Sequence, residues 1–194
     1  MEIDDRIRLR SWGKLKYYDS ESILRRFREY EIDVYDLDID DKVKTLRTSI
    51  LKKHKYGREA ALFCYGLGYC VLNVKVYFIR DESEDYDFVA TWTEGINQIY
   101  APVQMKELVP HDVNEGANLQ KIIDMLAEYK KSDNTMACIY LNRRELLKLE
   151  DLVIPKLSMA CLWFFGSATP DQSKWFLYGD MTREPKYHEF FYPA

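Results

Sequence analysis

Three strand-forming segments follow one another in the middle of the chain, and this spacing constrains the fold more than any other feature. Residues 71–79 (VLNVKVYFI), 87–92 (DFVATW) and 99–109 (IYAPVQMKELV) are rich in β-branched and aromatic residues. The polar turns DESEDY and TEGINQ separate them. Because connections this short join antiparallel neighbours, the sequence predicts a three-stranded meander.

A helix and one further strand are predicted after the meander. Residues 117–130 place Leu119, Ile122, Ile123, Leu126 and Ala127 on one face, which indicates an amphipathic helix. Residues 135–142 (TMACIYLN) are almost continuously apolar, as expected of a strand buried on both faces. The pattern therefore predicts a crossover helix that leads to a buried parallel strand.

Helices are also predicted ahead of the meander. One covers residues 20–31 with Ser20 as its N-cap, and a second covers residues 42–53 with Asp40 as its cap. A third starts near Tyr56 and leads into the first strand of the meander.

The C-terminal part is expected to extend the sheet. Residues 157–165 and 174–180 are predicted strands of a hairpin, and a short helical piece is expected over 145–149. The aromatic side chains of this region either fill the core or form a dimer face. The residues concerned are Trp163, Phe164, Phe165, Trp175 and Phe176.

Together these elements predict one compact α/β domain in three segments. Residues 1–55 form an N-terminal helical extension, residues 56–142 the core with a mixed sheet, and residues 143–194 a C-terminal β extension. A chain of 194 residues suits such a domain.

Charge and cysteine content narrow the class of protein. The net charge of −4 argues against a general basic field for coating nucleic acid. Cationic residues nevertheless cluster over 6–16, 25–28 and 42–58, either as solvated helix faces or as a local basic surface. The four cysteines form no CxxC pair and have apolar neighbours, which predicts buried thiols in a reducing compartment. With a charged N-terminus and no long apolar run, the expected location is the cytoplasm, without a membrane partner.

Asp87, Gln104 and Lys106 are the candidate functional residues of the meander. Gln104 and Lys106 lie two apart in a predicted strand, so their side chains point to the same face. Asp87 begins the preceding strand. A carboxylate, an amide oxygen and an ammonium group suit phosphodiester hydrolysis, in which a hard cation orients water and the ammonium stabilises charge. The side chains of a Gln/Lys pair within such apolar strands also need polar partners or solvent.

With Asp87 followed by Gln104-Met105-Lys106, and with this order of elements, the chain resembles the PD-(D/E)XK nuclease superfamily. The closest resemblance is to archaeal Holliday junction resolvases and Mrr-type restriction nucleases, and it covers residues 56–142. It implies a restriction-endonuclease-like αβββαβ core and an endonuclease that acts on DNA, alone or as a homodimer.

The resemblance also implies roles for individual residues. Asp87, Gln104 and Glu59, the last on the preceding helix, would hold Mg²⁺ or Mn²⁺, and Lys106 would act in catalysis. Gln104 replaces the family's usual carboxylate, which Asp85 or Glu107 as well as Glu59 could compensate. Some Mrr-type members carry the same QxK pattern, which implies that activity can survive it. Pro102 predicts an edge or a bulge in the third strand of the meander.

Other interpretations remain open. The chain could be a catalytically inactive nuclease-fold module that binds nucleic acid or protein. It could also be a different α/β enzyme with its pocket in the aromatic C-terminal region. Asp87, Lys106 and Glu59 could be ordinary strand and helix residues. Residues 142–144 (NRR) either meet phosphates or form a solvated strand end.

Overall fold

The computed structural model shows a mixed α/β protein. It describes residues 3–44, 46, 48–81, 83, 86–130, 132–143, 148 and 151–193. Among these residues, eight strands form a mixed sheet in which the strand order follows the chain order. The chain divides into two compact units: unit 1 comprises Met1–Arg80, Val89–Tyr100 and Tyr192–Ala194, and unit 2 comprises Asp81–Phe88 and Ala101–Phe191.

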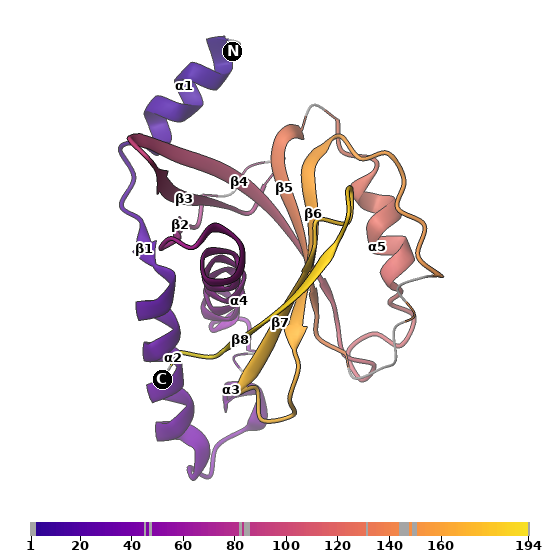
Figure 1. Ribbon diagram of the computed structural model, residues 1–194. Helices are drawn as coiled ribbons and strands as arrows, with labels where there is room; N and C mark the ends of the chain where they lie inside the picture. Colours follow the sequence, from indigo (N-terminus) through magenta and orange to yellow (C-terminus); the bar gives the residue numbers. More distant parts are fainter. Residues whose placement is uncertain are drawn as a thin grey trace. The chain divides into compact units, whose positions relative to one another are not determined.

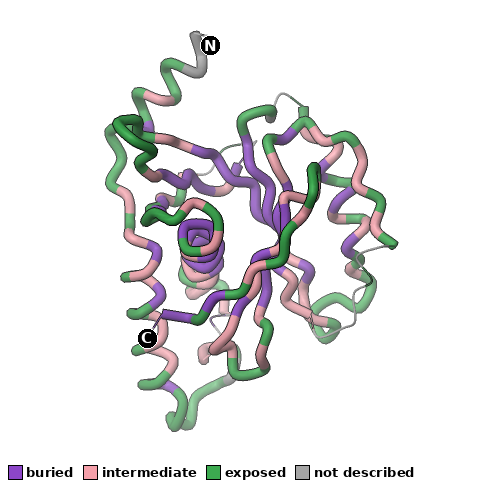
Figure 2. The backbone as a smooth tube through the Cα atoms, viewed as in Figure 1, coloured by how far each residue is buried: buried purple, intermediate pink, exposed green. Residues whose placement is uncertain are grey.

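Unit 1 combines helices with short antiparallel strands (Figure 1). Its elements are α1 (Ile3–Trp12), β1 (Tyr18–Asp19), α2 (Ser20–Tyr35), α3 (Asp41–Lys44), α4 (Lys52–Leu67), the π-helical turn η1 (Gly68–Leu72), β2 (Tyr77–Ile79) and most of β3 (Phe88–Glu94). β1 pairs with β2, and β2 with β3, both antiparallel. α2 packs against α4, whose second half is almost wholly buried (Figure 2).

The start of α2 differs by one residue from the predicted cap. Asp19 is the N-cap, and its carboxylate accepts a hydrogen bond of 3.0 Å from the backbone N–H of Ser22. Ser20, the predicted cap, is instead the first helical residue, and its buried hydroxyl donates to the carbonyl oxygen of Val76 at 2.8 Å. Two acceptable caps stand side by side in the sequence, and the tertiary bond to Val76 decides between them.

The helix predicted over residues 42–53 is wrong. Asp40 does cap a helix, because its carboxylate accepts from the N–H of Lys42 at 2.7 Å, but α3 ends at Lys44. Leu46 then takes a left-handed conformation with φ of 58°, which a right-handed helix cannot continue. Its side chain is buried, so packing stabilises the break, and α4 begins afresh at Lys52.

The strand predicted over residues 71–79 is much shorter in the structure. η1 extends α4 and ends at Asn73, which is left-handed with φ of 53°, and β2 starts only at Tyr77. The chain folds back closely here, since a Cβ on Gly68 would lie 2.6 Å from the carbonyl oxygen of Val74. Only glycine allows that approach. The alternating pattern from Val71 thus belongs partly to a helical turn.

Unit 2 is built on parallel strands around one crossover helix. Its elements are the main part of β4 (Asn97–Leu108), α5 (Leu119–Leu126), β5 (Ser132–Leu141), β6 (Met159–Ser167), β7 (Lys174–Gly179) and β8 (Lys186–Phe191). β4 is parallel to β5 and β5 to β6, whereas β6, β7 and β8 are antiparallel neighbours. The predicted crossover to a buried parallel strand and the predicted C-terminal hairpin are therefore confirmed, and β8 adds a strand that was not predicted.

α5 covers one face of these strands with a continuous apolar core. The helix is shorter than the predicted 117–130, beginning at Leu119 after the N-cap Asn118 and ending at Leu126. The buried members of the core are Leu108, Leu119, Ile123, Leu126, Ala137, Ile139, Met159, Leu162 and Phe164. Residues 106 and 104 precede Leu108 on the same face of β4, so the candidate residues stand beside this core.

Pro102 does not lie in an edge strand. β4 stands between β3 and β5 in the sheet, so the prediction of an edge is wrong. The pairs between β4 and β5 begin at Val103, one residue further on. The missing N–H of Pro102 therefore precedes the parallel ladder, where it removes none of these pairs.

The aromatic side chains of the C-terminal region belong mainly to the core. Trp163, Phe164, Phe165 and Trp175 are buried, as the core interpretation requires, whereas Phe176 is half-buried. The helical piece predicted over 145–149 lies almost wholly outside the described residues.

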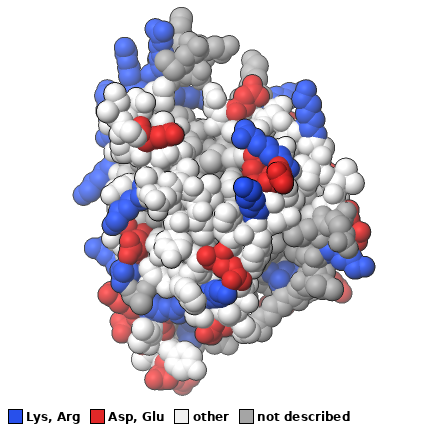
Figure 3. Space-filling view, in the orientation of Figure 1, with Lys and Arg blue, Asp and Glu red and all other residues white. Residues whose placement is uncertain are grey.

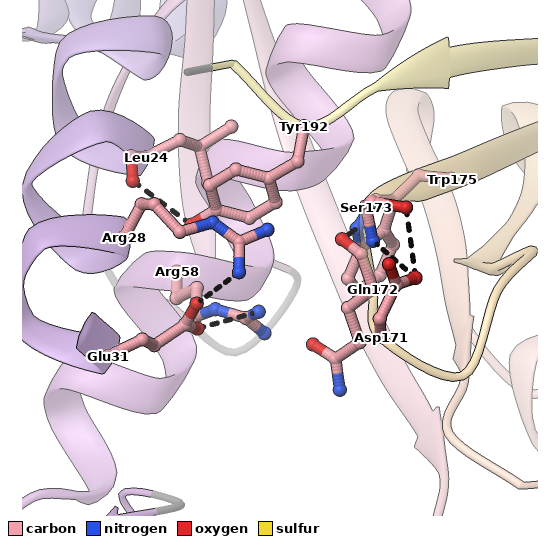
Figure 4. A network of polar contacts seen from close by, with 9 residues as sticks. All are labelled: Leu24, Arg28, Glu31, Arg58, Asp171, Gln172, Ser173, Trp175 and Tyr192. Carbon is pink, nitrogen blue, oxygen red and sulfur yellow. Dashed lines mark hydrogen bonds and ion pairs between the residues drawn. The ribbon is translucent and has the colours of Figure 1, made fainter. Parts of the chain in front are cut away.

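Tyr192, near the C-terminus, packs against helices of unit 1 (Figure 4). Its buried hydroxyl donates to the carbonyl oxygen of Leu24 in α2 at 3.0 Å. The guanidinium of Arg28 lies 4.4 Å from the centre of its ring, and Glu31 bridges Arg28 and Arg58 at 3.1 and 2.9 Å. Burial raises the pKa of Tyr192 to about 12. The C-terminal residues are thereby tied to α2 and α4.

The cysteines and the membrane prediction can also be compared with the structure. All four cysteines are thiols, with Cys64 and Cys138 buried and Cys70 and Cys161 half-buried. Burial raises the pKa of Cys161 to about 12. In the part of the chain that the structure describes, every helix is too short or too polar to cross a membrane.

Candidate functional site

Asp87 lies at the entrance of β3, where the polar turn of the meander ends. Its backbone N–H donates to the carbonyl oxygen of Val103 at 2.9 Å, which fixes the residue beside β4. Its Oδ2 atom accepts two hydrogen bonds, from Nε2 of Gln104 at 2.5 Å and from the backbone N–H of Met105 at 2.7 Å. The carboxylate is thus oriented by both a side chain and the backbone of β4.

Gln104 is the buried polar partner of this carboxylate. Its side chain is only 4% exposed. A buried amide is costly unless it is hydrogen-bonded, and the carboxylate supplies the acceptor for its NH₂ group. Since a carboxylate only accepts hydrogen bonds, the amide must present nitrogen to Asp87 and turn its oxygen elsewhere. The pair predicted from the sequence is therefore in direct contact.

Lys106 shares the face of β4 with Gln104. In the parallel register Gln104 lies beside Ala137 and Lys106 beside Ile139. The ammonium of Lys106 donates to the hydroxyl of Tyr129 at 3.1 Å and lies 5.5 Å from the centre of that ring. Tyr129 follows α5, so this helix positions the lysine. Tyr129 was not among the predicted site residues, because a tyrosine just beyond a helix carries no local signal of a partner on a strand.

Glu59 has a different setting from the other three residues. It lies in α4 of unit 1, whereas Asp87, Gln104 and Lys106 belong to unit 2. Its side chain is 2% exposed, and Lys55, one turn earlier, approaches its Oε1 atom to 3.4 Å. A buried carboxylate in an ion pair of this kind is costly to form and strongly disrupted when one partner is removed.

The carboxyl ends of β4 and β5 carry a second polar group. Asn142 donates to Glu107 at 2.7 Å and accepts from the hydroxyl of Tyr140 at 3.3 Å. Arg143 donates to three carbonyl oxygens of the loop after β4, those of Val109, Asn114 and Ala117, at 2.9, 2.7 and 3.0 Å. Arg143 therefore holds the loop, a role that neither sequence interpretation of residues 142–144 foresaw. Arg144 lies outside the described residues.

Asp87 would be the anionic ligand if a magnesium ion bound at this position. Mg²⁺ is often held by one or two carboxylates together with water and substrate phosphate. The amide oxygen of Gln104 could join only if the side chain turned its oxygen toward the cation. Within the described ranges, His, Cys, Asp and Glu side chains gather nowhere in a group of three or more that could hold a metal. Asp85 is not among the described residues.

Comparison with protein-family models, with curated proteins and with solved structures gave no match to this chain.

Proposed function

We propose that this chain has a restriction-endonuclease-like core and hydrolyses DNA phosphodiester bonds with Mg²⁺ or Mn²⁺. The site consists of Asp87, Gln104 and Lys106, which all lie in unit 2. The single observation that carries the proposal is the contact of 2.5 Å between the Gln104 amide and the Asp87 carboxylate. It joins the first two elements of the sequence pattern, and Lys106 follows on the same face of β4.

The order of elements supports the proposed core. α4, β2, β3, β4, α5 and β5 follow one another along the chain. β2 and β3 are antiparallel, the short turn between β3 and β4 requires another antiparallel pair, and β5 returns parallel to β4. This order supports the αβββαβ core that the resemblance implies.

Each residue of the site has a chemical role in this proposal. Asp87 supplies the anionic ligand, and the N–H of Met105 holds its carboxylate in place. When bound, the divalent cation would lower the pKa of a water molecule and stabilise charge on the phosphate. Lys106 would donate a hydrogen bond to a phosphoryl oxygen as negative charge develops there. Tyr129 is the positioning residue that orients its ammonium.

Replacing Lys106 by Met tests the proposal, because Met keeps the length of the side chain and removes its charge. We expect the rate of Mn²⁺-dependent cleavage of a labelled DNA duplex to fall about 10²- to 10³-fold, the usual cost of losing one charge-stabilising donor. Lys121→Met, on the exposed side of α5, is the matched control and should cleave as the wild type does. Equal cleavage rates for Lys106→Met and the wild type would refute the catalytic role.

A second candidate function is favoured by the orientation of Gln104. Its amide nitrogen, not its oxygen, faces Asp87, so each group satisfies the other without a cation. Such a pair suits a non-catalytic module of the same fold that binds nucleic acid or protein. Cation binding to the wild-type protein separates the two candidates.

Gln104→Glu should make the site sensitive to metal. The substitution places two mutually repelling carboxylates side by side and removes the amide donor. The free energy of unfolding in EDTA should therefore fall by about 2–3 kcal/mol. Excess Mg²⁺ should restore about 2.7 kcal/mol at a hundredfold excess over Kd, and it should also stabilise the wild type measurably. Urea unfolding with KCl at matched ionic strength measures both effects. If Mg²⁺ leaves the wild type unchanged, the non-catalytic module is the better account.

A further inference from the structure

The part of α1 from Arg6 onward and the turn after it carry a dense positive charge, after Asp4 and Asp5 in the first turn of the helix. Residues 6–16 contain five cations and no acidic residue, in a chain whose net charge is −4. The five are exposed: Arg6, Arg8, Arg10, Lys14 and Lys16. Cationic side chains project from α1 in the space-filling view, near the N-terminus (Figure 3). Residues 6–16 are therefore one of the basic segments of an acidic chain; residues 42–58, with seven cations and no acidic residue, are another.

α1 is attached to the rest of unit 1 at its C-terminal end. Trp12 is buried there, with its ring 6.4 Å from that of Tyr100, and the hydroxyl of Tyr17 donates to the carbonyl oxygen of Trp12 at 3.1 Å. Ahead of Trp12 the helix lacks a buried apolar stripe, since Ile7 is 59% exposed and Leu9 is only half-buried. Figure 1 shows α1 extending beyond α2 and the strands of the same unit.

A helix of this length and composition needs an external partner. Its ten residues are too few for a stable isolated helix in water, and packing of an apolar face usually supplies the missing stability. α1 has little such packing beyond Trp12. An anionic partner would add favourable charge contacts with the exposed cations of this segment.

The chemistry of the cations selects a phosphate polymer. The guanidinium fork of arginine matches two phosphate oxygens at once. The ten residues of α1 span about 15 Å, a length over which duplex DNA presents several phosphates. A helix that lies on a membrane needs a continuous apolar face, which α1 lacks. The same segment therefore suits nucleic acid better than a lipid surface.

We infer that α1 with residues 13–16 forms a basic arm that binds the phosphate backbone of nucleic acid without reading its sequence. This inference goes beyond the proposed hydrolysis, because the arm lies in unit 1 and uses none of the residues Asp87, Gln104 and Lys106. Trp12 anchors the arm, and the exposed cations make the contacts. The arm gives an acidic protein a local means of holding DNA.

Three substitutions at once, Arg6→Gln, Arg10→Gln and Lys14→Gln, test the arm in the full-length protein. Glutamine keeps most of the helix propensity and removes the charge. The matched control, Arg26→Gln with Lys53→Gln and Lys156→Gln, changes the net charge equally at exposed positions elsewhere. Fluorescence anisotropy with a labelled 20-bp duplex, in EDTA and from 50 to 200 mM salt, gives the affinity and its salt dependence.

The arm variant should bind the duplex at least about tenfold more weakly at 50 mM salt. The slope of log K against log salt should become shallower by about 2 to 3, because each lost phosphate contact contributes about 0.9. The control should bind as the wild type does. The inference is overturned if both variants lose DNA affinity equally or if the arm variant binds DNA as tightly as the wild type. It is also overturned if the wild type binds vesicles of phosphatidylserine but not DNA.

The arm and the hydrolytic function fail in different ways. Binding through the arm without any cleavage would leave the arm intact and refute the proposed hydrolysis. Cleavage by a protein whose arm variant binds normally would refute the arm alone. The binding measurement in EDTA therefore decides the inference without reference to activity.

Discussion

Asp87→Asn is expected to lower the rate of metal-dependent DNA cleavage by at least about 10³-fold, or about 4 kcal/mol in the activation barrier. The amide oxygen of Asn can still accept from Gln104 and from the N–H of Met105, so both hydrogen bonds at this position keep an acceptor. What the substitution removes is the negative charge, the main contribution of this residue to holding a cation. Single-turnover cleavage of an end-labelled duplex measures the rate.

The stability of Asp87→Asn separates chemistry from folding. Because its hydrogen bonds are kept, the free energy of unfolding should stay within about 1–2 kcal/mol of wild type. Asp133→Asn, at an exposed position of β5, is the control and should change neither cleavage nor stability. A variant at Asp87 that cleaves at the wild-type rate would show that this carboxylate is structural only.

Trp175→Ala should destabilise the protein by about 3–5 kcal/mol, the usual cost of removing a buried aromatic side chain from a core. Trp175 in β7 is 0% exposed, and its ring stacks on that of Tyr140 in β5 at a distance of 5.9 Å between ring centres. Its Nε1–H donates to the carbonyl oxygen of Gln172 at 2.8 Å (Figure 4). One side chain thus links the loop before β7 to the centre of the sheet.

Trp175→Phe serves as the graded control. It keeps an aromatic ring against Tyr140 and loses the hydrogen bond to Gln172. Its loss in free energy of unfolding should therefore be about half that of the alanine variant or smaller. Urea unfolding followed by far-UV circular dichroism measures both variants. If Trp175→Ala unfolds at the wild-type urea concentration, the sheet of unit 2 does not depend on this side chain.

The core elements could be predicted because their sequence patterns agree with their tertiary settings. Local propensity and burial both favour strands in the segments that became β3 and β4, predicted over 87–92 and 99–109. The continuous apolar run over 135–142 is typical of a strand buried on both faces, and it lies in β5 except for its last residue. The failures occurred where a tertiary contact decided the outcome. Leu46 breaks a helix that its sequence would continue, and Gly68 lets the chain turn back where alternation suggested a strand.

The site could be predicted only in its short-range geometry. The two-residue period of a strand puts Gln104 and Lys106 on one face, and a short connection brings Asp87 beside them. The sequence could not predict which atoms of these side chains are in contact. That the amide nitrogen of Gln104 faces Asp87, and that Tyr129 holds Lys106, depends on how β3 and α5 pack against β4.

β8 shows a different limit. Residues 186–191 show only a weak alternation of buried and exposed side chains, in which Phe190 is buried and its neighbours are exposed. The strand lies at the edge of the sheet and pairs with one neighbour. A strand of this kind has little hydrophobic pattern to detect, and β7 specifies it through backbone pairing. The aromatic content of this region indicated buried side chains but did not indicate that they belong to a strand.

Incubation of labelled DNA with the purified wild-type protein, in Mn²⁺ and then in EDTA, shows whether the protein is a metal-dependent nuclease. We expect cleavage of duplex or branched DNA that requires the metal, stops in EDTA, and is lost in Asp87→Asn and Lys106→Met. Failure of the folded wild-type protein to cleave either DNA with either metal would contradict this expectation. So would cleavage that persists unchanged in both variants.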